Sequence, residues 1–296
     1  MLEAITRPIG SVLRAASRPE TYPGHVRELT STLLTASVWP AGWREGDEPD
    51  RAPTGGDDPE SSVGTPVLLV HGFGANKSNW LFVERYLRQA GFGRVDALNY
   101  NPLTHDVPAL AGQVVDRARS LQERYGVERI HLIGHSLGGV LVRYAVQVHD
   151  LENVGVAATI SSPHGGIRLA RHASWMGLRH PASGIDLAPH SPVMRSFRET
   201  ARPLPTRFVA YYSNLDLIVP ARRAIIREPE LGATNILVKD HGHVSIMLSR
   251  RLATSIVTQL GAADGLAGYG APVTRLRGPN DAPATAERDL PQAVSE

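Results

Sequence analysis

The hydrophobic residues of this chain gather in short apolar runs, which are separated by stretches with helical spacing. PVLLV at 66–70 is continuously apolar, as expected of a strand that is buried on both faces of a parallel sheet. Similar strands are predicted at 95–100, 129–134, 154–161, 207–213 and 235–238. Helices are predicted at 79–90, 107–125, 139–149 and 244–260. This alternation predicts an α/β fold with a mostly parallel central sheet and helices on both faces.

The alternation occupies residues 65–260, and the flanking regions differ from it. The N-terminal segment 1–43 is predicted to be helical from the apolar spacing of residues 2–17. Because Pro8 interrupts that spacing, we favour packing on the rest of the chain over a membrane-surface helix. The segment 44–64 is rich in Pro, Gly and Asp, which predicts an acidic linker or surface loop. The tail 261–296 has little to bury and is predicted to be poorly ordered. Since 296 residues are few for two full-sized enzyme domains, we expect one main domain, at 65–260.

The alternation stops between two of the predicted strands. Residues 163–205 contain several Pro and Gly and only short apolar groups, among them Trp175, Met176, Leu178 and Leu187. An insertion of this length between sheet strands is usually functional or mobile. We therefore predict a lid or cap insertion at 163–205.

Composition excludes several classes of protein. The formal net charge is only +2 and the 31 basic residues are dispersed, so we expect no nucleic-acid partner. Cysteine is absent, which removes disulfides, thiolate metal sites and a cysteine nucleophile. No apolar run is long enough for a signal peptide or a membrane span, so we expect a cytoplasmic protein. Transient contact with a membrane or lipid interface stays open, and the pattern carries no signal for oligomeric state.

The residues Gly134-His135-Ser136-Leu137-Gly138 match the pattern G-x-S-x-G between a predicted strand and a predicted helix. A serine in this position occupies a tight turn with its hydroxyl exposed, and the glycines leave room that larger side chains would fill. His135 is expected to point away from the serine. A plain turn at the sheet edge is the alternative interpretation, but the flanking strand and helix favour Ser136 as a nucleophile.

A serine hydroxyl needs a general base, and after such a turn the partners follow in the order Ser, Asp or Glu, His. Asp216 follows the predicted strand at 207–213, and His243 stands between the last strand and the last helix. Both positions are at strand ends, where catalytic groups of such sheets collect. We therefore predict a catalytic triad of Ser136, Asp216 and His243.

Other residues compete for two of these roles. His241 is the rival base, and we prefer His243 because it directly precedes the helix. Asp186, in the insertion, is the alternative to Asp216. Asp240 is too close to the histidine in sequence to be the usual orienting acid.

Acyl transfer at a serine also needs N–H donors for the oxyanion of the tetrahedral intermediate. One donor is expected from Leu137, directly after the serine, and the second from the loop after the first strand. His71-Gly72-Phe73-Gly74 occupies that loop, so the Phe73 N–H is the candidate. A flexible turn is the alternative interpretation of this loop.

Five segments together resemble the successive motifs of bacterial triacylglycerol lipases and related esterases of the α/β-hydrolase superfamily. They are PVLLVHGFGANKSNW, HLIGHSLGG, SSPHGG, SNLDLIVP and HGHVSIMLS, and they span roughly residues 65–260. The resemblance implies an oxyanion hole at Phe73 and Leu137 and a triad of Ser136, Asp216 and His243. It also implies that Pro163-His164-Gly165-Gly166 lies beside the active site, where the lid begins. The N-terminus lacks the signal peptide of secreted members, which argues against extracellular fat digestion.

The sequence thus predicts a lipase or esterase that cleaves a small-molecule or lipid ester through an acyl-enzyme, without a cofactor. Trp175, Met176 and Leu178 would bind substrate if the insertion is a lid; ordinary cap packing is the alternative. An acyltransferase, thioesterase or lipid deacylase could use the same triad, and a non-catalytic ligand-binding member of the fold is a further alternative. A dehalogenase is disfavoured because serine, not aspartate, occupies the turn. No metal site is predicted from histidine spacing, although scattered acids leave a calcium site open.

Overall fold

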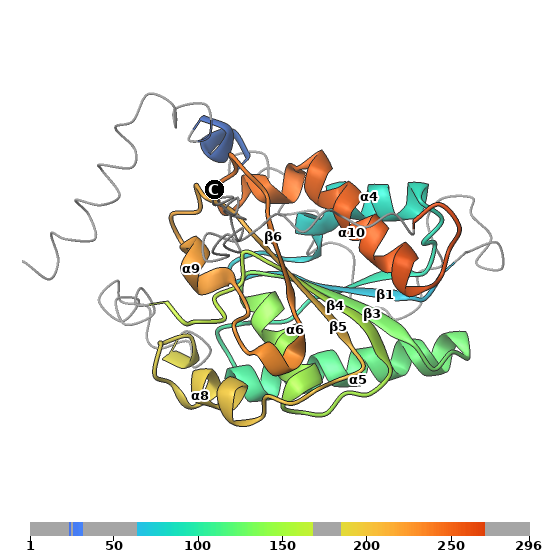
Figure 1. Ribbon diagram of the computed structural model, residues 1–296, viewed down its shortest axis with the longest axis horizontal. Helices are drawn as coiled ribbons and strands as arrows, with labels where there is room; N and C mark the ends of the chain where they lie inside the picture. Colours follow the sequence, from blue (N-terminus) through green and yellow to red (C-terminus); the bar gives the residue numbers. More distant parts are fainter. Residues whose placement is uncertain (1–23, 25, 32–63, 168–184, 270–296) are drawn as a thin grey trace, which may run out of the picture.

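The protein is described by a computed structural model, which covers residues 24, 26–31, 64–167 and 185–269 (Figure 1). The predicted helix at 2–17, nearly all of the 44–64 linker, and Trp175, Met176 and Leu178 of the insertion lie outside the described residues.

Within the described residues, six parallel strands form one sheet in the order β2-β1-β3-β4-β5-β6. The strands are β1 (Val67–Val70), β2 (Val95–Leu98), β3 (Ile130–His135), β4 (Val154–Ile160), β5 (Arg207–Tyr212) and β6 (Thr234–Leu237). All residues of β1, β3 and β4 are buried, as their continuous apolar runs require. The two edge strands, β2 and β6, are partly exposed.

Helices cover both faces of this sheet (Figure 1). One face carries α4 (Leu81–Gln89) and α10 (Arg250–Ala263), and the other carries α5 (Val107–Tyr125), α6 (Leu137–Gln147) and α8 (Pro192–Glu199). Shorter elements are the 3₁₀ helices η3 (Lys77–Trp80), η6 (Pro229–Leu231) and η7 (Ser245–Leu248) and the single turn α9 (Ala221–Ala224). The side chains between sheet and helices form two apolar clusters, one on each face. The predicted parallel sheet with helices on both faces is confirmed.

Local signals set the bounds of α5, the helix whose predicted ends agree with the structure. The Asp106 side chain accepts a hydrogen bond from Ala109 N at 2.9 Å, and Pro108 stands in the first turn. Gly126 ends the helix in the left-handed region, at φ 61°. Apolar residues at helical spacing along α5 face the sheet.

The structure adds to the predicted organisation in two places. The helix α8, which the sequence pattern did not indicate, lies inside the 163–205 insertion, and Leu187 is buried in the same apolar cluster. This part of the insertion is packed on the domain. At the other end, α10 continues past 260 to Ala263, and Tyr269 packs against the apolar cluster on its face of the sheet. The predicted tail therefore begins later than 261.

Across the described part of the chain, no helix combines the length and the apolar character needed to cross a membrane.

Two glycine substitutions test how closely α6 packs against the sheet, with α5 as the comparison. At Gly138 an added Cβ would stand 2.1 Å from the Val70 carbonyl oxygen, whereas at Gly112, inside α5, it would meet no described heavy atom within 4 Å. We expect Gly138→Ala to lower the free energy of unfolding by about 3 kcal/mol or more. We expect Gly112→Ala to raise it by about 0.5–1 kcal/mol, because alanine favours helix. Urea unfolding measures both, and a Gly138→Ala variant as stable as the wild type would contradict this packing.

Candidate active site

Ser136 occupies a sharp turn between β3 and α6. Its backbone has φ 52° and ψ −120°, and a positive φ is rare for a residue with a side chain. Such a conformation costs on the order of 1–3 kcal/mol and persists only when the surroundings impose it. The turn places Ser136 at the carboxyl end of β3, where it is held by a hydrogen bond from its N–H to the Ile160 carbonyl at 2.8 Å.

Three glycines impose this turn by allowing backbones to approach closely. A Cβ at Gly134 would lie 2.4 Å from the Gly138 carbonyl group, and one at Gly138 would lie 2.1 Å from the Val70 carbonyl oxygen. A Cβ at Gly139 would stand 1.9 Å from Ser162 Oγ. No other residue type fits these positions without movement of the backbone or of a buried serine.

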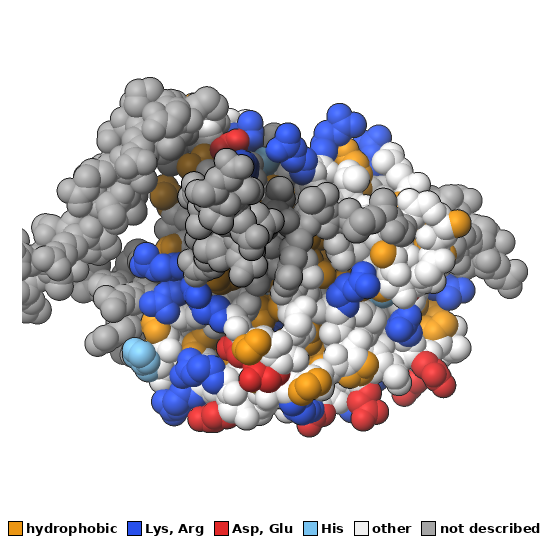
Figure 2. Space-filling model, viewed as in Figure 1, with side chains coloured by type: hydrophobic (Ala, Val, Ile, Leu, Met, Phe, Trp, Pro, Cys, Tyr) orange, Lys and Arg blue, Asp and Glu red, His pale blue; other side chains and the backbone are white. Residues whose placement is uncertain are grey.

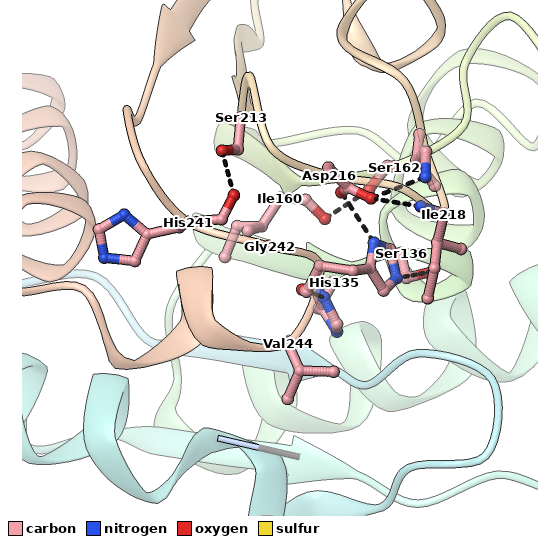
Figure 3. Close-up of polar contacts among 12 residues, drawn as sticks. His135, Ser136, Ile160, Ser162, Ser213, Asp216, Ile218, His241, Gly242 and Val244 are labelled. Atoms are coloured by element: carbon pink, nitrogen blue, oxygen red, sulfur yellow. Dashed lines mark hydrogen bonds and ion pairs between the residues drawn. The ribbon is translucent and has the colours of Figure 1, made fainter. Parts of the chain in front are cut away.

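Ser136, His243 and Asp216 form a continuous chain of hydrogen bonds (Figure 3). Ser136 Oγ lies 3.0 Å from His243 Nε2, and His243 Nδ1 lies 2.8 Å from Asp216 Oδ2. Asp216 comes from the loop after β5, and His243 from the loop between β6 and η7. The structure therefore brings together the three residues that the sequence predicts as a triad.

The environment of Asp216 fixes the tautomer of His243. Burial acts to raise the pKa of Asp216, but hydrogen bonding and charge interaction with His243 and the Val219 N–H outweigh it, so the pKa is lowered. The second carboxylate oxygen accepts from Ile218 N at 2.9 Å and Val219 N at 2.7 Å. Because an ionised carboxylate only accepts, His243 Nδ1 donates to it, and Nε2 is left to accept from the Ser136 hydroxyl.

The rival residues lie elsewhere. The imidazole of His241 points away from Ser136 (Figure 3), and its Nδ1 lies 2.7 Å from the Lys239 carbonyl oxygen. Asp186 accepts from Val107 N at 2.8 Å, at the start of α5. Asp240 is exposed, and its N–H donates to the Asn214 side chain at 2.9 Å.

The two predicted oxyanion donors flank Ser136. Leu137 is the first residue of α6, and the first N–H groups of a helix have no acceptor within the helix. The 72–75 turn follows β1, closed by a hydrogen bond from Ala75 N to the Gly72 carbonyl at 3.2 Å, with Phe73 at its tip. A Cβ on Gly72 would lie 3.0 Å from Ser136 Cβ, so this turn lies directly against the serine.

His135 contributes to the site in a way that the sequence did not indicate. Its ring stands 5.0 Å from the His243 ring, centroid to centroid. Its Nε2 donates to the His243 carbonyl oxygen at 3.1 Å, while its Nδ1 lies 3.3 Å from the amide nitrogen of Asn79. The amide can only donate, which makes Nδ1 the acceptor and Nε2 the protonated nitrogen. Nothing in the spacing of Asn79 marks it as a partner of this histidine.

The surface beside the triad is partly apolar. Phe73, Leu217 and Ile218 are each more than two-fifths exposed, and they belong to the 72–75 turn and to the loop that carries Asp216. Elsewhere, on the face that Figure 2 shows, basic and acidic side chains are interspersed over the described residues. The described residues contain no group of three or more His, Asp or Glu side chains that is arranged to hold a metal ion.

Residues 67–255 match the alpha/beta hydrolase family. The chain belongs to this family. The match covers all six strands and contains Ser136, Asp216 and His243. It confirms the fold that the sequence motifs implied.

Individual α/β hydrolases and related proteins show more limited similarity. A triacylglycerol lipase of Pseudomonas fragi is 30% identical over 117 residues, which are 38% of this chain and 39% of the lipase. The dihydrolipoyllysine-residue acetyltransferase component of an acetoin cleaving system of Pseudomonas putida is 28% identical over 147 residues, 46% of this chain and 39% of that protein. The chain thus spans about two-fifths of the length of these curated relatives.

Among solved structures, the mature lipase BlEst2 of Bacillus licheniformis superposes with a TM-score of 0.57 at 19% identity. The superposition covers 68% of this chain and 96% of that lipase. At this identity the likeness establishes a shared fold.

Three buried histidines predict how stability depends on pH. Burial lowers the pKa of His71 to about 4, that of His135 to about 3, and that of His164 well below its usual value. Between pH 6.5 and 4 the unfolded chain therefore binds protons that the folded chain excludes, so stability falls as the pH falls. We expect the free energy of unfolding to drop from pH 7 to pH 5, by up to about 1.4 kcal/mol per pH unit for each histidine.

Urea unfolding at the two pH values measures this effect. His164→Asn should weaken the pH dependence, whereas His149→Gln, at an exposed position, should leave it unchanged. Equal or greater stability of the wild type at pH 5 would contradict the assignment of neutral buried histidines.

Proposed function

We propose that this α/β hydrolase is a serine hydrolase that cleaves carboxylic esters through an acyl-enzyme on Ser136. The observation that carries the proposal is the hydrogen-bond chain from Ser136 Oγ to His243 Nε2 at 3.0 Å and from His243 Nδ1 to Asp216 at 2.8 Å. A nucleophile, a base within reach of its proton and an acid that orients the base are the groups that acyl transfer requires.

In the proposed reaction, Ser136 Oγ attacks the ester carbonyl carbon while His243 Nε2 accepts the hydroxyl proton. The same proton then passes to the departing alkoxide, which leaves as an alcohol and an acyl-enzyme remains. Water attacks this acyl group, again losing a proton to His243; His243 then returns that proton to Ser136 Oγ as the acyl bond breaks, and the carboxylic acid is released. The Asp216 carboxylate stabilises the imidazolium at both stages and holds its tautomer.

The oxyanion of each tetrahedral intermediate would accept hydrogen bonds from the N–H groups of Leu137 and Phe73. The position of Leu137 at the start of α6 supports this role, because the helix dipole adds positive potential there. The closeness of the 72–75 turn to Ser136 supports the role of Phe73.

We propose an ester with an apolar acyl group as the substrate. The exposed side chains of Phe73, Leu217 and Ile218 beside the triad support this class, since apolar surface favours apolar ligands. The similarity to a triacylglycerol lipase agrees with it.

Transfer of the acyl group to another acceptor is a second candidate. It is favoured by the similarity to an acetyltransferase component over 46% of this chain. Product analysis with a competing alcohol separates the two candidates. A new ester among the products would favour transfer, and the free acid alone would favour hydrolysis.

The roles in the triad predict a large loss of activity when Ser136 or Asp216 is replaced. We expect Ser136→Ala to lower kcat for a p-nitrophenyl ester by about 10³-fold or more, and Asp216→Asn by a similar factor because the histidine loses its orienting acceptor. Ser255→Ala, in α10, where the hydroxyl lies 3.1 Å from the Tyr211 hydroxyl, is the matched serine control and should retain wild-type turnover. Thermal unfolding of each variant verifies that it is folded. A folded Ser136→Ala variant with near wild-type kcat would overturn the proposal.

A chain-length series tests the substrate class. We expect kcat/KM for p-nitrophenyl esters to rise from acetate towards medium-chain acyl groups, because each buried methylene contributes about 0.8 kcal/mol. The ratio of kcat/KM between consecutive esters of the series measures this preference. A fall in kcat/KM from the acetate onwards would reject an apolar acyl site.

A further inference from the structure

The helical segment 26–31 lies outside the part of the chain that matches the family, yet it contacts the loop that carries His243 (Figure 1). Its residue Glu28 lies 216 positions from Val244 in the sequence. In space, its carboxylate accepts hydrogen bonds from Val244 N at 2.7 Å and from Ser245 N at 2.8 Å.

These two hydrogen bonds satisfy backbone N–H groups at the start of a helix. The 3₁₀ helix η7 begins at Ser245, and its preceding residue, Val244, provides no side-chain cap. The first N–H groups of such a helix require an acceptor from outside it. A carboxylate that accepts from both makes charge-assisted bonds, which are stronger than those of a neutral cap.

The loop that carries His243 has space for the Glu28 carboxylate. A Cβ at Gly242 would lie 2.3 Å from Glu28 Oε2, so the glycine leaves the space that the carboxylate occupies. The neighbouring Arg27 donates from Nη1 to the Asp240 carbonyl oxygen at 2.8 Å. The segment therefore holds the loop on both sides of His243.

The peptide group between His243 and Val244 is fixed at both of its polar ends. Its carbonyl oxygen accepts from His135 Nε2 at 3.1 Å, and its N–H donates to Glu28 at 2.7 Å. Because a peptide group is planar, fixing both ends sets its orientation and hence the direction in which the adjoining His243 side chain leaves the backbone. That direction decides whether the imidazole reaches Ser136 and Asp216 together.

We propose that Glu28 is a positioning residue for His243, through which an N-terminal segment outside the family match completes the active site. The consequence for catalysis rests on the proposed function, in which His243 is the general base. Loss of the carboxylate frees the Val244 N–H and lets the peptide group turn. The imidazole then spends less time in reach of both partners, and misplacement of about 1 Å is enough to lower turnover roughly 10²-fold.

The test compares Glu28→Gln and Glu28→Ala with two controls. Glu84→Gln removes a carboxylate from a surface pair with Arg88 on α4, and Thr30→Ala removes a hydroxyl that donates to Val26 within the same segment. We expect kcat for a p-nitrophenyl ester to fall about 10-fold in Glu28→Gln and about 100-fold in Glu28→Ala, with KM within about twofold. The controls should retain wild-type kcat.

A second pair of variants separates positioning from loss of fold. Gly242→Ala should displace the carboxylate, because its Cβ would overlap Glu28 Oε2, and should lower kcat. In the Glu28→Ala background that overlap disappears, so the double variant should be no slower than Glu28→Ala alone. Additive losses would contradict the proposal.

A spectroscopic measurement gives a result that does not depend on turnover. The proton of His243 Nδ1, shared with Asp216, should give a downfield proton resonance in the wild type and in both controls, and the resonance should be lost or broadened in Glu28→Ala. If the wild type cleaves no ester but this difference is seen, the proposed function fails and the positioning role stands. If Glu28→Ala is folded and keeps both the resonance and wild-type kcat, the positioning role is overturned and the proposed function is unaffected.

Discussion

The approach of α6 to the sheet at Gly134, Gly138 and Gly139 is the constraint on which the rest of the site depends. Where a Cβ at Gly138 would lie 2.1 Å from the Val70 carbonyl, the helix can begin only one residue after the strand ends. That proximity forces Ser136 to φ 52° and pushes its hydroxyl out of the turn. Packing of the buried strands on either side offsets the free-energy cost of this strained backbone.

The other two residues of the hydrogen-bond chain, Asp216 and His243, are positioned by the carboxyl ends of neighbouring strands. Asp216 leaves β5 and His243 leaves β6, so a parallel register brings both to the edge where Ser136 stands. Burial acts to raise the pKa of Asp216, but hydrogen bonding and charge interaction with His243, together with the Val219 N–H, lower it. An ionised acid in that place leaves His243 Nε2 to accept the hydrogen bond of the Ser136 hydroxyl.

The parts of the molecule that depend on local signals could be predicted from the sequence. The ends of α5 follow from Asp106 and Gly126, and the Ser136 turn follows from its glycines. The helix α8 was missed because the surrounding insertion lacks a regular period, although Ser191 caps it and Pro192 opens it. Glu28 and Asn79 could not have been found, because each acts on the site only through contacts that tertiary folding creates.

The central claim is that Ser136 is a nucleophile made reactive by its contact with His243, and covalent trapping tests it most directly. The protein is treated with a fluorophosphonate ester, digested, and its peptides are analysed by mass spectrometry. The account predicts one phosphonylated peptide, modified at Ser136, with labelling abolished in Ser136→Ala and strongly slowed in His243→Ala. A wild-type protein that stays unmodified, or that is modified at a different residue, would contradict it.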